Sequence, residues 1–372
     1  MRAVGWRARF GAVLLAALLG MATVGPAAAW AGDGHPGHAG RHLGVATYNL
    51  YLGADFTPLF TATSQEELVQ RAGQVYANVV KTDFPSRAEA IARLLADDPP
   101  DVAGLQEVAL WETGPIGGQL QPSYDFLRLL LDALARHGLA YRPVAVNANF
   151  TGSLPISATT AARFTDRDVV IARAGRRAPE VRNPDSHNFA AALVIPTAIP
   201  GLSFTVLRGW STVDVKLRGR TVRFANTHLE AFSTDARNAQ ARELAAALAQ
   251  SRHPVVLVGD LNSRPDDAAG AYGTFQAAGY ADAWVAVHGP EGGFTSGQSE
   301  LLDNVPSLID HRIDYVLYQP GHVRAVAAEV IGEELGDRTS AGLWPSDHAG
   351  VVAALRLQHS VSNRHTGRTG RA

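Results

Sequence analysis

The 372-residue sequence contains no cysteine. Disulfide bonds, thiolate metal sites and a cysteine nucleophile are therefore excluded. A chain without disulfides depends on its core for stability, and a hydrophobic content of 46% is ample for one. Any metal ligands in this protein must be oxygen atoms or imidazole nitrogens.

The sequence also lacks an excess of basic residues, because 33 Lys and Arg stand against 35 Asp and Glu. A nucleic-acid-binding protein usually has a basic stripe, and the only visible basic run lies in residues 364–371. Binding of a phosphate ester by charge alone is thus disfavoured. A protein of this composition that handles phosphate esters needs a divalent metal ion.

Long apolar runs are scarce, and the clear one covers about residues 10–24. It is shorter than the ~20 residues that span a bilayer, and it follows Arg2, Arg7 and Arg9. Small residues around positions 27–31 offer a cleavage site. The pattern predicts a signal peptide over residues 1–31, a secreted protein and no stable membrane anchor, with an uncleaved anchor as the alternative.

The flanks of the remaining chain differ in composition from its body. Residues 32–42 are rich in Gly and His and predict a disordered leader, while residues 359–372 predict a disordered basic tail. Residues 43–358 contain the core-forming segments, with no fixed-period repeat and no long linker. We therefore expect one domain over 43–358 and a monomeric protein.

Strands and helices alternate along this domain. Capping boxes at Ser64/Glu67 and Ser86/Glu89 predict two helices between the first two strands. Further helices are predicted at 123–137, 235–250 and 266–279, whereas 141–167 has no clear single form. Strands are predicted at 43–52, 101–108, 168–173, 189–196, 202–217, 221–232, 254–258, 312–318 and 323–331, with a last strand after His348.

Polar residues stand where the buried strands stop. The clearest case is Gly259-Asp260-Leu261-Asn262, which directly follows an apolar strand. Alone, such a pattern is more often an Asx turn. Ionisable groups beside apolar runs are costly unless paired or ligated, so a whole set of them predicts a site. The set is Asn49, Glu107, His228, Asp260, Asn262, Asp314, Asp347 and His348.

The chemistry of these side chains suggests their roles. Glu107, Asn49 and Asp347 offer hard oxygen ligands of the kind that Mg²⁺, Mn²⁺ or Ca²⁺ prefers. Asp260 and Asn262 combine an acceptor with an amide, which suits the positioning of a water molecule.

Two imidazoles complete the hypothesis. One of His228 and His348, when charged, can hydrogen-bond phosphoryl oxygens, and the other, oriented by a carboxylate such as Asp314, can move a proton.

Six ordered motifs, TYN, LQEV, NTHLE, GDLNSRP, RIDYVL and SDH, span residues 47–348. Together they resemble the endonuclease/exonuclease/phosphatase superfamily, which includes pancreatic-type deoxyribonuclease, abasic-site endonucleases, neutral sphingomyelinases and inositol polyphosphate phosphatases. The resemblance implies a catalytic domain over 43–358 with an α/β fold, a four-layer α/β/β/α sandwich of two mixed β-sheets packed face to face. It also implies a site at one end of the sheets.

The resemblance implies a role for each site residue. It implies metal binding by Glu107, Asn49 and Asp347, phosphate contact by His228, alignment of water by Asp260 and Asn262, and proton transfer by His348 oriented by Asp314. Arg173 closes a strand where members often carry a basic residue, which implies substrate binding.

The predicted reaction is metal-assisted in-line hydrolysis of a phosphodiester. Nucleic acid is the favoured substrate, with Arg163, Arg167, Arg173 and Arg208 as candidate contacts. The alternative is a phospholipid or sphingomyelin phosphodiesterase with aromatics near its site, for which Trp210, Trp284, Trp344 and Phe294 are available. A phosphomonoesterase and a non-catalytic binding module are further, less favoured hypotheses.

Overall fold

A computed structural model describes residues 42–176 and 178–358 of the chain. The predicted signal peptide, the leader up to residue 41 and the tail from residue 359 lie outside these residues. Within the described ranges, no helix combines the length and the apolar composition that crossing a membrane requires.

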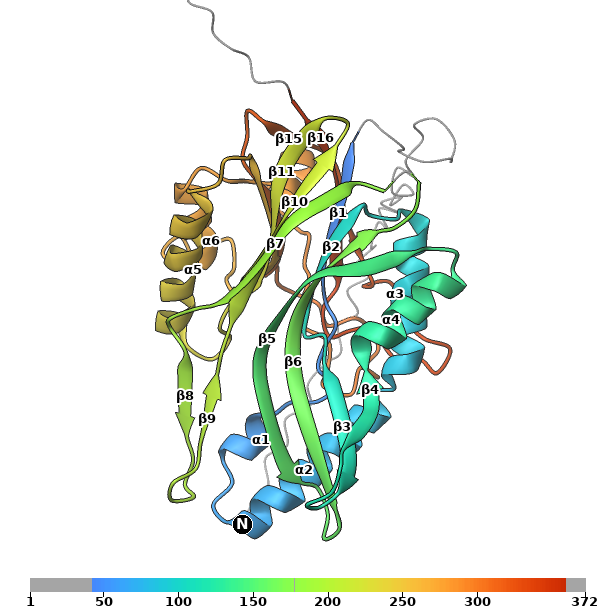
Figure 1. Ribbon diagram of the computed structural model, residues 1–372, viewed down its shortest axis with the longest axis vertical. Helices are drawn as coiled ribbons and strands as arrows, with labels where there is room; N and C mark the ends of the chain where they lie inside the picture. The colour runs from blue at the N-terminus through green and yellow to red at the C-terminus, as the bar shows by residue number, and fades with distance from the viewer. Residues whose placement is uncertain (1–41, 177, 359–372) are drawn as a thin grey trace, which may run out of the picture. The chain divides into compact units, whose positions relative to one another are not determined.

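Two large mixed sheets form the centre of the fold (Figure 1). The first has the strand order β15-β16-β1-β2-β6-β3-β4, with β5 also paired to β6. Its strands are β1 (Leu43–Asn49), β2 (Val102–Gln106), β3 (Leu110–Pro115), β4 (Gln121–Asp125), β5 (Tyr141–Pro155), β6 (Thr160–Arg173), β15 (Val323–Ile331) and β16 (Gly350–Leu357).

The second sheet has the order β13-β14-β12-β11-β10-β7. Its strands are β7 (Glu180–Asn188), β10 (Gly209–Leu217), β11 (Arg220–His228), β12 (Val255–Asp260), β13 (Ala281–Asp282) and β14 (Asp314–Tyr318). A separate two-stranded hairpin consists of β8 (Leu193–Pro196) and β9 (Ser203–Val206).

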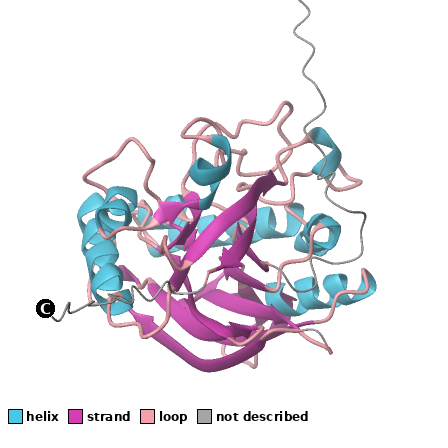
Figure 2. Cartoon of the chain, turned by 90° about the horizontal axis from the view of Figure 1, so that it is seen from above, coloured by secondary structure: helices cyan, strands magenta, loops and turns pink. Residues whose placement is uncertain are grey.

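The helices cover the outer faces of the sheets (Figure 2). On the first sheet lie α2 (Gln65–Lys81), α3 (Phe84–Asp97) and α4 (Phe126–Arg136), and on the second lie α5 (Thr234–Leu248) and α6 (Ala271–Ala277). The short elements are α1 (Thr57–Phe60), α7 (Ala283–His288) and the 3₁₀ helix η1 (Leu335–Asp337). The four-layer sandwich expected from the sequence is confirmed.

Successive residues of the central strands face opposite sides of the sheet, and both sides are covered, so the strands are continuous apolar runs in the sequence. In β1, Val45 faces the other sheet while Ala46 faces the helices, and in β12 Val258 and Leu257 divide in the same way. Because both faces are covered, every residue of β12 is buried. Full burial of a valine or leucine side chain contributes about 1.5–3 kcal/mol, so these strands fix the frame on which the polar strand ends are held.

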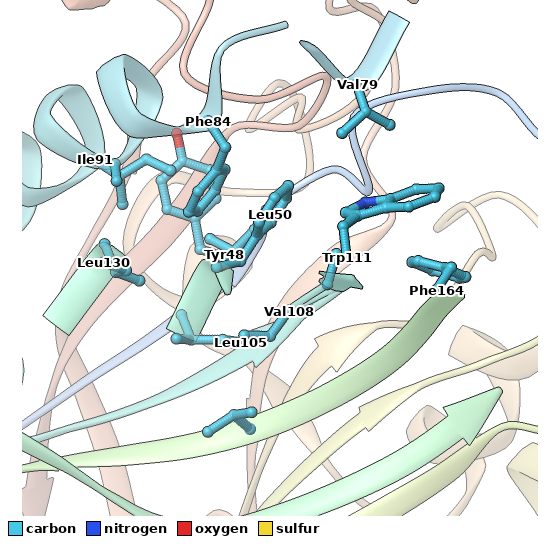
Figure 3. Packing of buried hydrophobic residues seen from close by; sticks show 14 of the residues in the cluster. Tyr48, Leu50, Val79, Phe84, Ile91, Leu105, Val108, Trp111, Leu130 and Phe164 are labelled. Atoms are coloured by element: carbon cyan, nitrogen blue, oxygen red, sulfur yellow. The ribbon is translucent and has the colours of Figure 1, made fainter. Parts of the chain in front are cut away.

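Aromatic rings fill the layer between the first sheet and its helices (Figure 3). Phe84 at the start of α3 stacks on Phe126 at the start of α4, with ring centroids 3.6 Å apart. Trp111 of β3 lies against Phe164 of β6, with centroids 4.7 Å apart. The second pair stands at the border of a cavity described below.

Several element predictions need correction. The box at Ser64 caps α2 as expected, through the Glu67 N–H, but Ser86 lies inside α3, whose N-cap is Asp83. Residues 141–167, for which the sequence predicted no single secondary structure, belong to the long antiparallel strand pair β5 and β6 and its turn. The expected strand 202–217 is two strands, β9 and β10, because the chain leaves the hairpin at Leu207 and enters the second sheet at Gly209. The helix expected over 266–279 covers only 271–277.

Candidate active site

Three polar residues form one row across the end of the second sheet. His228 of β11 pairs in register with Asp260 of the parallel strand β12, and Asp260 pairs with Asp314 of the antiparallel strand β14. All three are almost completely buried. Gly259 precedes Asp260 with φ of +147°, and a Cβ there would lie 2.0 Å from the Thr227 carbonyl oxygen, so only glycine lets β11 and β12 approach this closely.

The first sheet contributes a second pair of strand ends. Asn49 ends β1, and Glu107 follows β2, its parallel neighbour. The Asn49 amide donates to Asp260 Oδ2 at 3.1 Å, which joins the ends of the two sheets. Glu107 has a φ of +56°, a strained value for a residue with a Cβ, and its Oε2 accepts the Leu52 N–H at 2.8 Å. The strained backbone at Glu107 thus orients its carboxylate toward the loop after β1.

His348 is held by the carboxylate of Asp314. Its Nδ1 lies 2.8 Å from Asp314 Oδ2, and its Nε2 lies 3.8 Å from Asp260 Oδ2. Burial lowers the pKa of His348, but the charges of Asp314 and Asp347 outweigh burial and hold that pKa well above its usual value. His348 therefore carries two ring protons at neutral pH, with Nδ1–H donated to Asp314 and Nε2 lying 3.4 Å from Ser296 Oγ as well as 3.8 Å from Asp260 Oδ2.

His228 is in the opposite state because its partner is an arginine. Arg208 Nη1 lies 3.0 Å from His228 Nδ1, and a guanidinium can only donate. Nδ1 is therefore the acceptor, and Nε2, 3.5 Å from Asp260 Oδ2, carries the single ring proton. Burial and the charge of Arg208 lower the pKa of His228 well below its usual value. The charged imidazole and the one that Asp314 orients are thus the same residue, His348, whereas the sequence suggested a division between two.

Asn262 is both a turn residue and a member of the polar cluster, the two interpretations that the sequence of the GDLN segment allowed. Its backbone N–H donates to Asp260 Oδ1 at 2.9 Å, which is an Asx turn. With φ of +47°, the turn directs the side chain back over β11, where Nδ2 donates to the Leu229 carbonyl at 3.0 Å. Nδ2 also lies 3.2 Å from His228 Nε2, but with the ring proton on Nε2 this contact joins two N–H groups and is not a hydrogen bond. The turn is therefore the means by which the amide reaches the cluster.

The cluster opens into a cavity of about 830 Å³. Among the described residues that line it, six carboxyl side chains stand against two cationic side chains, those of Arg208 and the protonated His348. Burial and the charges of Asp347 and Asp166 raise the pKa of Glu107 to about 8, and burial and the charge of Asp314 raise that of Asp260 to about 7. Crowded carboxylates of this kind favour a bound cation.

The donor set fits a hard divalent ion. Glu107 and Asp347 are half-buried carboxylates on the cavity wall, and the buried Oδ1 of Asp314 accepts no hydrogen bond from a described residue. A second possible set, Asp260, Asp314 and His348, has ligand atoms within 4.8 Å of one another. Asn49 is fully buried, and its Oδ1 accepts the Tyr51 N–H at 3.0 Å. Direct metal binding by Asn49 stays a prediction.

A sequence comparison identifies the family. Residues 46–348 match the profile of the Endonuclease/Exonuclease/phosphatase family. The chain belongs to this family. Members hydrolyse phosphoesters with divalent metals, so the protein is a phosphoester hydrolase. A comparison of the sequence with curated proteins finds no match.

Solved structures of the endonuclease/exonuclease/phosphatase family share this fold. A member from Beutenbergia cavernae is 24% identical, with a TM-score of 0.55 over 86% of this chain and 72% of that one. A member from Bacteroides thetaiotaomicron is 16% identical, with a TM-score of 0.55 over 86% and 98% of the two chains. A mannosyl-6-phosphatase from the same species is 17% identical, with a TM-score of 0.51 over 84% and 99%. At these identities the likeness concerns the fold alone.

Two residues predicted near the site of this family member lie elsewhere. Arg173 ends β6, but β6 runs antiparallel to β2, so its end lies beside Asp101 at the opposite edge from Glu107. Arg173 is therefore not part of the catalytic cluster, and its role in substrate binding stays a prediction. Trp344, three residues before Asp347, is fully buried, and its Nε1 donates to the Asn304 carbonyl at 2.8 Å, so it is not an exposed aromatic.

Two arginines that sequence analysis did not place support the site. Arg208 was one of four arginines considered as substrate contacts. Two of the others, Arg163 and Arg167, form ion pairs with Glu112 and Asp125. Arg87 is fully buried and donates to the carbonyls of Leu50, Tyr51, Thr82 and Pro345 at 2.7–3.2 Å. It thereby joins the loop after Asn49 to the loop before Asp347. Arg87 lies in the amphipathic helix α3, and nothing in the sequence pattern of that helix indicated that its side chain would join the two loops.

Proposed function

We propose that the protein is a divalent-metal-dependent phosphodiesterase that hydrolyses its substrate by in-line attack of water. The observation that carries the proposal is the convergence on Asp260 of a protonated imidazole, His348, and a neutral one, His228, at 3.8 and 3.5 Å. A carboxylate with a pKa near 7 beside two imidazoles in different protonation states suits acid–base chemistry at neutral pH.

Glu107 and Asp347 would hold the metal ion, Mg²⁺ or alternatively Mn²⁺ or Ca²⁺, on the cavity wall. When bound, the ion supplies a Lewis acid that offsets the negative charge of the phosphoryl group. This supply of positive charge matters because both cations of the described cavity lining already face protein groups: Arg208 faces His228, Asp166 and Glu230, and His348 faces Asp314.

The remaining work falls to side chains of this protein. Asp260 and Asn262 orient the attacking water, and Asp260 takes its proton as the new P–O bond forms. His228 donates its Nε2–H to a phosphoryl oxygen. His348 gives a proton to the departing ester oxygen as the old P–O bond breaks, and Asp314 holds the ring in place. Proton exchange with solvent then restores Asp260 and His348.

The physiological ester and secretion rest on the sequence alone. Nucleic acid stays the sequence-based prediction, and phospholipid is its alternative. Arg163, Arg167 and Arg208 each pair with a carboxylate within the protein, so their positive charge is already offset by the protein itself.

A parallel assay tests this proposal. The purified protein receives bis(p-nitrophenyl) phosphate, plasmid DNA, or vesicles containing sphingomyelin and phosphatidylcholine, each with Mg²⁺ or with chelator. We expect metal-dependent hydrolysis of the aryl diester that is lost in His348→Ala and kept in His322→Ala, a matched change at an exposed histidine. Absence of hydrolysis of all esters under every metal condition would rule the proposed function out.

A further inference from the structure

The cavity at the catalytic cluster has a second, apolar part. Its walls include six aromatic side chains, which together define the apolar chamber: Phe56, Phe60, Trp111, Phe164, Phe204 and Phe232. They come from the segment around α1, from β3 and β6 of the first sheet, from the hairpin strand β9, and from the loop after β11. In Figure 1 the hairpin and α1 lie beside the lower ends of β5 and β6.

The rings make two continuous apolar surfaces. Phe56, Trp111 and Phe164 contact one another with ring centroids 4.7–5.8 Å apart, and Figure 3 shows Trp111 beside Phe164. Phe60 contacts Phe204 at 5.3 Å and Phe232 at 6.0 Å. Phe232 is 59% exposed, which is unusual for so large an apolar side chain. An apolar concave surface of this extent favours a ligand that covers it.

The chamber is continuous with the catalytic cluster through two segments. Leu52 donates its N–H to Glu107 Oε2 and accepts the Trp111 Nε1–H at its carbonyl, so one residue touches both regions. The hairpin strand β9 ends at Val206, two residues before Arg208, which binds His228. The cluster and the chamber therefore line one cavity, and a group attached to a phosphate at the cluster lies next to the chamber.

The polar atoms of the chamber wall favour an aliphatic group over a nucleobase. Trp111 Nε1 is bonded to the Leu52 carbonyl, Ser153 Oγ to the Ala162 carbonyl, and Thr151 Oγ1 to Thr165 Oγ1. The aromatic rings offer a base no hydrogen-bond partners, and these three groups already bond within the protein, so a base placed against the rings would bury N–H and C=O groups at a cost. An alkyl chain has no such groups, and each of its buried methylenes is favourable.

We infer that the substrate is a phosphodiester with an aliphatic chain on one of its alcohols, and that the apolar chamber binds this chain while the cluster holds the phosphate. The inference rests on the proposed function and names its substrate class. A volume of about 830 Å³ for cluster and chamber together lies within the range of sites that enclose a whole ligand of this kind.

Binding of alkylphosphonates tests the inference without requiring turnover. Calorimetry with Mg²⁺ gives the Kd of methyl-, butyl- and octylphosphonate, and each added methylene is expected to lower Kd about fourfold. The same compounds should inhibit hydrolysis of bis(p-nitrophenyl) phosphate in the same order.

Variants of the chamber test which residues bind the chain. In Phe204→Ser and Phe232→Ser the ratio of the methylphosphonate Kd to the octylphosphonate Kd should fall toward one. The matched change Phe294→Ser, at an exposed ring outside the cavity, should keep the ratio. Phe232 is exposed, so its variant tests the chamber even where Phe204→Ser folds poorly.

The outcomes separate the two claims. Metal-dependent turnover with a Kd that does not depend on chain length would overturn the aliphatic substrate and leave the proposed function standing. Chain-length-dependent binding with no turnover of any ester would overturn the proposed function and support the chamber as a site for aliphatic phosphates. Vesicles and monomeric short-chain lipids, compared in the turnover assay, show whether the chain comes from a bilayer or from a soluble ester.

Discussion

His348 Nδ1 lies 2.8 Å from Asp314 Oδ2, while Nε2 of the same ring faces Asp260 Oδ2 at 3.8 Å. The two carboxylates come from adjacent antiparallel strands and are in register, so one imidazole spans the row. This relationship orients the ring, keeps it protonated, and places its second N–H at the cavity. The proposed proton transfer by His348 depends on this arrangement.

Asp314→Asn should lower kcat by about 100- to 10,000-fold, because the amide cannot hold the imidazolium and can instead favour the wrong tautomer. Steady-state hydrolysis of bis(p-nitrophenyl) phosphate measures the loss, and the titration of His348 by ¹⁵N NMR should show a lowered pKa. Asp132→Asn, on the exposed face of α4, is the matched control. An unchanged His348 titration in the Asp314 variant would remove the proposed basis for its protonation.

Arg208 is a positioning residue whose effect appears in the tautomer of His228. With ¹⁵N-labelled histidine, the wild-type ring should show the neutral form with the proton on Nε2 between pH 6 and 8. Arg208→Lys replaces a planar guanidinium by a compact ammonium, and we expect a mixture of tautomers and a lower kcat with little change in KM. A His228 ring that is charged at pH 7 in the wild type would contradict this assignment.

Glu107→Gln should raise the Mg²⁺ concentration for half-maximal activity tenfold or more, because a carboxylate ligand becomes a neutral amide. Calorimetric titration with Mg²⁺ supplies a readout independent of turnover. Glu300→Gln is the control, since Glu300 also lines the cavity but bonds to Asn78 through Oε1. Equal Mg²⁺ affinity in the two variants would exclude Glu107 as a ligand.

Glu333 makes stability depend on pH outside the site. Burial, together with the charges of Asp337, Glu334 and Glu329, raises the pKa of Glu333 to about 7 from the model-peptide value of 4.5. The folded state therefore holds a proton that the unfolded state releases between pH 4.5 and 7, and stability falls as pH rises through this window. Glu333→Gln should raise Tm at pH 8 and flatten this slope, whereas Glu291→Gln, at an exposed position whose charge does not act on Glu333, should change neither. A parallel pH dependence of Tm in wild type and Glu333→Gln would contradict the assignment.

The sequence predicted which residues meet because the site is built from strand ends. Asn49, His228 and Asp260 end buried strands and Glu107 follows one, and parallel strands bring such ends to one edge. Asp314 begins an antiparallel strand, which brings it to the same edge. The layer architecture followed for a similar reason, since apolar runs flanked by amphipathic helices indicate sheets covered on both faces.

The errors have equally specific causes. The direction of a strand within its sheet is a long-range property, so the end of β6 at Arg173 could not be distinguished from the end of β2 at Glu107. Arg208 lies between two strands that local sequence joins into one, and the chamber exists only because the hairpin β8–β9 folds toward α1. Trp344 is close to Asp347 in sequence, but it packs against Leu302 and Tyr51 beneath the loop.

The central claim is most directly tested by turnover of bis(p-nitrophenyl) phosphate in Mg²⁺ by wild type, Asp260→Ala, His228→Ala and the control Asp132→Ala, each with its fold verified by circular dichroism. The account predicts folded Asp260 and His228 variants with kcat reduced about 100- to 1,000-fold, and a control equal to wild type. Wild-type turnover in either the Asp260 or the His228 variant would contradict it.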